Sequence, residues 1–183
     1  MDSLQGHFLV ASPHLADGNF NRSVVLLVKH DEEGAFGLVL NRPTTSRVSD
    51  VWREVAQEAI ETGEMIYIGG PVTTALVSLH TIKSAAEMTA LPGVHFAASP
   101  EHLHKVIHAK GKPFRFLSGY SGWGSQQLEG ELEAGGWLVT SASAELVFSD
   151  SEELWERIVR VIAEDILAPV VPKKHTPKSP GLN

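Results

Sequence analysis

Uninterrupted apolar runs alternate with short polar segments near the start of the chain, a pattern typical of buried strands joined by turns. The runs lie at Phe8–Ser12, Ser23–His30 and Phe36–Leu40. The second run is rich in β-branched residues and apolar almost throughout, which predicts a strand buried on both faces. The acidic turn Asp31–Gly34 joins it to the third run, so the two predict a central β-hairpin. Pro43 ends the pairing, because proline has no backbone N–H to donate.

Apolar residues spaced three and four positions apart predict amphipathic helices in three later stretches. These are residues 48–59, residues 100–110 after a capping Ser99, and residues 149–162, where Ser149 and Glu152 predict a capping box. Residues 84–91 are rich in helix-forming residues and predict a fourth, short helix. Further short apolar runs predict strands at residues 65–68, 75–80, 94–97, 114–117 and 137–140. Together the runs predict a sheet of roughly eight strands.

Composition narrows the class of protein. With 183 residues, the chain is long enough for one domain that buries ~70% of its unfolded surface. Its formal net charge of −7 opposes a broad contact with DNA phosphates, so direct DNA binding is not expected. The sequence has no cysteine, and no apolar run approaches the ~20 residues that cross a bilayer. We therefore expect a cytoplasmic protein that does not bind membranes.

A change in composition near residue 168 divides the chain. Residues 1–167 carry the periodic apolar pattern and are expected to form a single domain. Residues 168–183 are rich in proline and lysine and contain no acidic residue. Because such a segment has little apolar surface to bury, we expect it to form a disordered tail.

Small residues and polar side chains are concentrated in one stretch, residues 119–131, here called the glycine segment. Its glycines predict a tight loop after a strand, and Ser125 is placed to cap the helix that follows. Backbone amides at a helix start favour an anion. Trp123 is interpreted either as a buried anchor or as the exposed rim of a pocket. The candidate ligand residues in this segment are Gly122, Trp123, Gly124, Ser125 and Gln127.

Two arginines flank the predicted central hairpin. Arg22 precedes its first strand and Arg42 follows its second, so antiparallel pairing brings both to one end of the sheet. A guanidinium group binds phosphate or carboxylate through two parallel hydrogen bonds, so Arg22, Asn41 and Arg42 are candidates to bind an anion together with the glycine segment. The alternative is an internal ion pair between an arginine and Glu129 or Glu131, with Asn41 forming a turn.

Four blocks of the sequence form a specific combination, and they lie at residues 20–25 (FNRSVV), 34–43 (GAFGLVLNRP), 69–72 (GGPV) and 119–131. In this order they resemble the blocks of the AlgH/YqgE family, and the similarity extends from about Leu4 to Ile162. The resemblance implies an α+β fold in which helices flank a curved, mixed, mainly antiparallel sheet, in a bacterial cytoplasmic protein of unassigned activity. The family's label of putative transcriptional regulator implies little here, because the chain shows no basic recognition helix. Ser121 and Gln126 depart from the family pattern, so neither is expected to be an obligatory reactive group.

The sequence does not contain the esterase motif or a nucleotide-binding motif. Gly119–Trp123 fails the Gly-x-Ser-x-Gly pattern of esterases at its last position, and no nucleotide-binding loop is present, so no cofactor is expected. His104 and His108 are one helical turn apart, but no third ligand lies near them in the sequence. We therefore favour a solvated helix face over a metal site. His30 and His80 are interpreted as strand-end groups bonded to the backbone.

Three functions remain open from the sequence. The preferred one is a binding or regulatory module that recognises an anionic small molecule or a protein partner. The second is a hydrolase or transferase that uses Glu129 or Glu131 as a base, which needs a raised carboxylate pKa. The third is a structural protein-interaction domain. A single concavity lined by both arginines and the glycine segment would favour the first.

Overall fold

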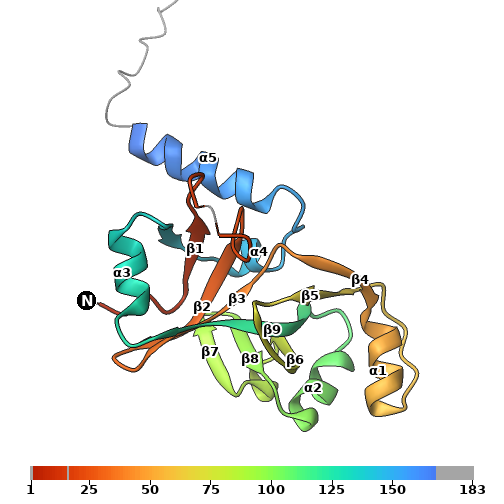
Figure 1. Cartoon of the computed structure of the whole chain (residues 1–183). Helices are drawn as coiled ribbons and strands as arrows, with labels where there is room; N and C mark the ends of the chain where they lie inside the picture. The colour runs from red at the N-terminus through yellow and green to blue at the C-terminus, as the bar shows by residue number, and fades with distance from the viewer. Residues whose placement is uncertain (1, 16, 168–183) are drawn as a thin grey trace, which may run out of the picture.

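One curled sheet of ten strands forms the centre of the computed structural model (Figure 1). The structure describes residues 2–15 and 17–167, so the predicted tail at residues 168–183 lies outside the described residues. The strands are β1 (His7–Ala11), β2 (Val24–Asp31), β3 (Gly34–Val39), β4 (Pro43–Arg47), β5 (Met65–Ile68), β6 (Val72–His80), β7 (Met88–Leu91), β8 (Val94–Ala97), β9 (Phe114–Gly124) and β10 (Trp137–Ser141). The sheet and its helices confirm the predicted α+β class.

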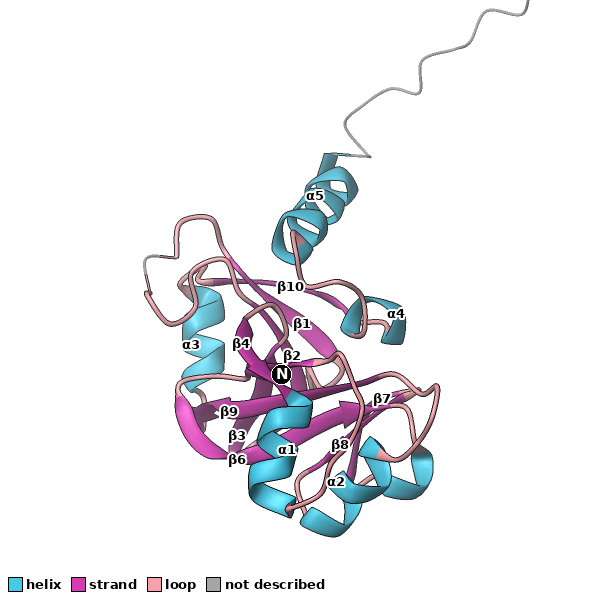
Figure 2. Cartoon of the chain, turned by 90° about the vertical axis from the view of Figure 1, so that its right-hand side faces the viewer, coloured by secondary structure: helices cyan, strands magenta, loops and turns pink. Residues whose placement is uncertain are grey.

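Five α-helices surround the sheet in three places (Figures 1 and 2). The first two lie at one end of the molecule, the third lies beside β1, the fourth lies near β1 and β2, and the last lies at the other end. They are α1 (Val48–Ala56), α2 (Pro100–Ile107), α3 (Gln127–Glu133), α4 (Ala144–Val147) and α5 (Leu154–Leu167). Among the described residues, none of the helices has both the length and the apolarity needed to cross a membrane.

The eleven-residue strand β9 joins the two parts of the sheet. Its first part pairs antiparallel with β6 and parallel with β5, and its end, Ser121 to Gly124, pairs antiparallel with β3. The strand order β10-β1-β2-β3-β9-β6-β8-β7 therefore passes through β9, while β4 and β5 pair at the side. The β5–β9 pair makes this mainly antiparallel sheet a mixed one, as predicted.

Strands β1 to β3 are buried on both faces, which explains their unbroken apolar runs. Phe8 and Leu26 belong to one core cluster, which includes residues of α5. Leu9 and Leu27 belong to a second cluster together with Leu128 of α3. Because successive residues of a strand point to opposite faces, each strand supplies two cores. A third cluster joins α1 and α2 to the sheet through Val48, Trp52, Ile66, Leu103, Val106 and Phe116.

Two local predictions are wrong and one strand was missed, each for a physical reason. Residues 84–91 form a 3₁₀ turn at Lys83–Ala85 and the strand β7, because pairing with β8 outweighs helix propensity. Strand β4 was missed because its residues are polar and it starts with a proline, which sheets accept only at an edge, at the first residue of a strand or at a bulge. The last helix begins at Leu154, and the Ser149 hydroxyl donates to the Leu146 carbonyl instead of forming a capping box.

Candidate functional site

The two arginines that were predicted to share one end of the sheet do so. Arg22 and Arg42 line a single hollow of about 540 Å³ beside the segment that leads into α5. We call it the arginine hollow. Its ionic lining residues are Arg22, Arg42, Asp150, Glu152, Glu153 and Glu156.

The Asn41 side chain forms hydrogen bonds with the backbone at this end of the sheet. Its side-chain oxygen accepts a hydrogen bond from the Val24 N–H at 2.9 Å, and its side-chain amide donates to the Arg22 carbonyl at 2.9 Å. The amide thus ties the start of β2 to the end of β3. The geometry supports the turn-forming alternative for Asn41, since both ends of its side chain are engaged.

The charges of the arginine hollow do not favour a small anion. The Arg22 guanidinium lies 3.5 Å from the Glu156 carboxylate and 5.1 Å from the centre of the Trp155 ring. Arg42 donates to the Asn21 carbonyl at 3.2 Å. Two guanidinium groups therefore share this hollow with the four carboxylates named above, and a further negative charge would be repelled by their excess.

The glycine segment begins as a strand, so the predicted tight loop is wrong. Gly122, Trp123 and Gly124 are the last residues of β9 and pair with the start of β3. At Gly34, which lies opposite Gly124 and has φ 136°, an added Cβ would collide with the Trp123 carbonyl oxygen. Glycine is therefore needed here for close contact between strands.

The predicted helix cap at Ser125 is also wrong. Its hydroxyl donates to the Glu32 carbonyl at 2.8 Å, while Gln126, at φ 61°, is the residue that precedes α3. The Gly124 N–H donates to the Gln127 side-chain oxygen at 3.0 Å, so this amide is not available to an anion. The segment is held by its own side chains and by the β2–β3 turn.

The arginines and the glycine segment lie at opposite ends of β3, so they do not form the single concavity that we expected. Gly122 pairs with Phe36 near the start of β3, whereas Arg42 follows the end of that strand. At ~3.3 Å per residue, the stretch from Phe36 to Arg42 spans roughly 20 Å. The described residues that line the two regions are entirely different.

Glu131 is the centre of a hydrogen-bonded cluster within the glycine segment and β10. One carboxylate oxygen accepts from the indole N–H of Trp123 at 2.9 Å and from that of Trp137 at 2.8 Å. The other oxygen accepts from the side-chain amide of Gln127 at 3.1 Å. These three donors are neutral, so they fix the carboxylate in place without cancelling its charge.

This cluster forms one wall of a hollow of about 610 Å³, which we call the tryptophan hollow. Trp123, Trp137 and Phe20 pack together with ring centres 5.2 to 6.0 Å apart. Trp123 is 5% exposed, so it is mainly a buried anchor whose edge lines the hollow. The described lining includes the carboxylates of Asp17 and Glu131, the imidazole of His14, and neither lysine nor arginine.

His30 and Glu129 form a separate pair on the other side of α3. The Leu4 N–H donates to His30 Nδ1 at 2.9 Å, so the ring proton is on Nε2, which donates to Glu129 at 3.0 Å. This confirms that His30 is a strand-end group bonded to the backbone. Hydrogen bonds from its own backbone amide and from His30 lower the pKa of Glu129, although burial opposes them. A general base would need the opposite shift.

Two residues in chemically informative positions were missed from the sequence. Glu58, which follows α1, lies 3.5 Å from His104 and 3.1 Å from His108, so a third side chain that is distant in the sequence joins the two histidines. Arg115, on strand β9, is a buried charged residue. Neither contact has a sequence signal, because each depends on the packing of elements that are distant along the chain.

Comparisons with known proteins agree with the resemblance seen in the sequence. The AlgH-like family model matches residues 8–167. A UPF0301 protein from Streptomyces avermitilis is 42% identical over 173 residues, which cover 87% of each chain. A UPF0301 protein from Chlorobaculum tepidum is 36% identical and covers 97% of this chain and 95% of its own. The solution structure of the AlgH protein from Pseudomonas aeruginosa matches with a TM-score of 0.73 and 30% identity over 95% of this chain and 96% of that one. By sequence and by fold, the chain belongs to the AlgH-like family.

Proposed function

We propose that the protein is a non-catalytic binding module and that the tryptophan hollow is its ligand site. The observation that carries this proposal is the Glu131 carboxylate, which three neutral donors hold at the wall of the hollow. No lysine or arginine among the described lining residues neutralises it. A ligand with an ammonium group would supply the missing positive charge.

The shape and composition of the hollow support this ligand class. Its volume of about 610 Å³ falls within the range of roughly 300–1,000 Å³ in which small-molecule sites occur. The aromatic rings of Phe20, Trp123 and Trp137 contribute apolar contact to the lining. Phe20 is the least buried of the three, and the face of an aromatic ring attracts cations. Asp17 adds a second carboxylate to the same lining.

The proposal changes the charge of the expected ligand. An anionic small molecule would have to bind in the arginine hollow against the excess of carboxylates there. A protein partner remains compatible, because a lysine side chain or an amino terminus presents the same ammonium group. We do not propose DNA binding, since the net charge of −7 opposes it. A cytoplasmic location stays part of the proposal, and the cysteine-free sequence is consistent with it.

An NMR titration tests the ligand site directly. The indole N–H signals of Trp123 and Trp137 report on the Glu131 carboxylate that they contact. Alkyl amines and diamines should shift these signals, and Glu131→Gln should weaken binding by about 10- to 100-fold, the cost of a charge-assisted hydrogen bond. Glu133→Gln is the matched control, because Glu133 lies on the same helix but lines the hollow beside His30.

Carboxylates and phosphates of matched length form the second arm of this titration. If they shift the side-chain signal of Arg42 while amines leave both indole signals unchanged, the ligand is an anion and the proposal is wrong.

The two alternative functions have weaker support. The carboxylate base of a hydrolase or transferase needs a raised pKa, whereas that of Glu129 is lowered. The oxygens of Glu131 already accept three hydrogen bonds within the protein. A purely structural role would be favoured if neither amines nor anions altered any signal in the titration.

A further inference from the structure

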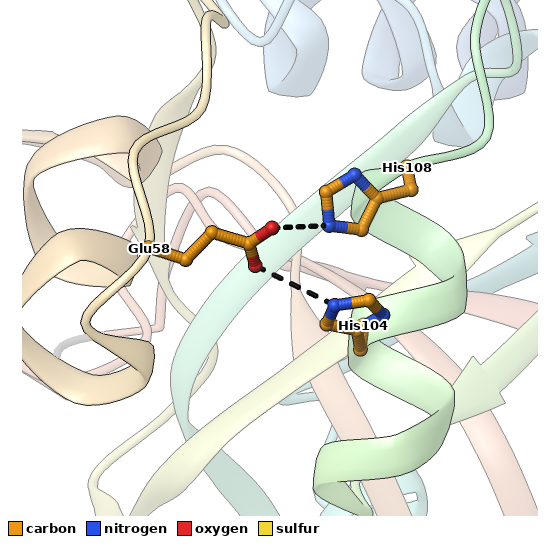
Figure 3. A group of neighbouring side chains, drawn as sticks. All are labelled: Glu58, His104 and His108. Carbon is orange, nitrogen blue, oxygen red and sulfur yellow. Dashed lines mark ion pairs between the residues drawn. The ribbon is translucent and has the colours of Figure 1, made fainter.

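Three metal-ligating side chains converge where the end of α1 approaches α2 (Figure 3). Gln57, at φ 54°, ends α1 and redirects the chain, and Glu58 then faces α2. His104 lies on α2, and His108 is the residue that caps its end one turn later. The ligand atoms of Glu58, His104 and His108 all lie within 4.8 Å of one another.

We propose that this cluster is a binding site for a divalent transition metal, with Zn²⁺ as the preferred ion. Two imidazole nitrogens and one carboxylate oxygen are a common donor set for Zn²⁺. With metal–ligand bonds of ~2.0–2.1 Å, the ligand atoms of a tetrahedral ion lie roughly 3.3 Å apart. His108 Nε2 lies 3.1 Å from Glu58 Oε1 and His104 Nε2 lies 3.5 Å from Glu58 Oε2, so the two imidazoles approach the two oxygens of one carboxylate at about this spacing. The imidazole donors disfavour Mg²⁺ and Ca²⁺, which prefer oxygen ligands.

The carboxylate is oriented by a group outside the cluster. The indole N–H of Trp52 donates to Glu58 at 3.1 Å, and the Trp52 ring is only 5% exposed within the core under α1. A hydrogen bond from a rigid neighbour to a ligating carboxylate is the usual way in which proteins fix a metal ligand. The orientation of Glu58 toward α2 is therefore built into the packing of α1.

The cluster leaves room for a ligand from outside the protein. The side chains of His104, His108 and Glu58 are 58%, 42% and 37% exposed. Three protein ligands on an open surface leave a tetrahedral ion with a fourth position for water or a small ligand, as in catalytic zinc sites. An apolar groove of about 280 Å³ is lined by Trp52, which donates to Glu58, and by Leu103, the residue before His104.

The same contacts also occur if protonated histidines simply pair with Glu58, so the experiment must separate a metal site from an ion pair. Zn²⁺ binding to the metal-stripped, tag-free full chain is measured by calorimetry near neutral pH, where imidazole is mostly neutral. We expect one Zn²⁺ per chain. With Co²⁺ as the probe, we expect the strong visible absorption of a tetrahedral ion.

Variants identify the ligands. Glu58→Gln and His108→Gln should remove stoichiometric binding, and Trp52→Phe should weaken it by about 10- to 100-fold through loss of the supporting hydrogen bond. His102→Gln is the matched control, because His102 is on the same helix and pairs with Glu87 at 3.0 Å outside the cluster. Absence of stoichiometric binding, or binding that His108→Gln leaves unchanged, would overturn the proposal. The tryptophan hollow shares no residue with this cluster, so the two proposals fail independently.

Discussion

The buried ring of His80 makes the stability of the protein depend on pH. The side chain is fully buried at the end of β6, where the Ile82 N–H donates to Nδ1 at 3.2 Å. This confirms its interpretation as a strand-end group bonded to the backbone. Burial, and then the nearby His95 and His102, lower the pKa of His80 from 6.5 to about 4, although Glu87 opposes the shift. The folded protein therefore disfavours protonated His80.

The direction of the pH effect follows from this shift. Between pH 6.5 and about 4 the unfolded chain binds a proton at His80 that the folded protein does not bind, so the stability conferred by neutral His80 is present above pH 6.5 and lost by about pH 4. The loss is on the order of 3 kcal/mol. Urea unfolding across this range should show it, and His80→Leu should reduce the slope. Exposed His14→Gln is the control, and an unchanged slope in the His80 variant would contradict the prediction.

At the scale of elements, the strands with long apolar runs were predicted correctly, whereas two helix caps and the helix at residues 84–91 were not, and contacts between distant elements were missed. The hairpin of β2 and β3 is local, so the sequence placed Arg22 and Arg42 at one end of the sheet. The partner of β9 is distant, so its glycines were interpreted as a loop rather than as a contact with Gly34. Glu58 was missed for the same reason, because the packing of α1 brings it to α2.

Arg115 ties three elements together and provides a test at this scale. Its guanidinium donates to the Leu40 carbonyl at 2.7 Å and to the Ser149 carbonyl at 2.8 Å, and it lies 4.3 Å from the centre of the Tyr67 ring. Arg115→Lys should lower the free energy of unfolding by about 2 kcal/mol, because the single nitrogen of lysine cannot occupy both Nη positions and lysine has no planar group to stack on the ring. Urea denaturation measures this.

The control for this substitution is Arg53→Lys on the exposed side of α1, where no change is expected. Equal stability of Arg115→Lys and the unmodified protein would show that the buried guanidinium does not hold these elements together.

At the scale of the whole molecule, the candidate sites are distributed over separate surfaces. The tryptophan hollow lies against α3, the arginine hollow lies beside the start of α5, and the Glu58 cluster lies between α1 and α2. The sequence correctly predicted the α+β class and the family, because the apolar runs and the four blocks are continuous stretches of sequence that can be recognised without the structure. It did not predict that the arginines and the glycine segment lie on separate surfaces, since that depends on how β9 joins the two parts of the sheet.

The central position of β9 has a consequence for synthesis of the protein. Strands β3, β5 and β6 all hydrogen-bond to β9, yet they precede it in the chain. A nascent chain on the ribosome therefore carries three strands with unsatisfied edges until Phe114–Gly124 has emerged, and such edges promote aggregation. Stalled chains that end before Phe114 should be digested rapidly by protease, whereas chains that expose all of β10 should resist. During translation the nascent chain is therefore prone to aggregation and proteolysis, and chaperones would have to protect it. This period ends only when the eleven residues of β9 join the sheet.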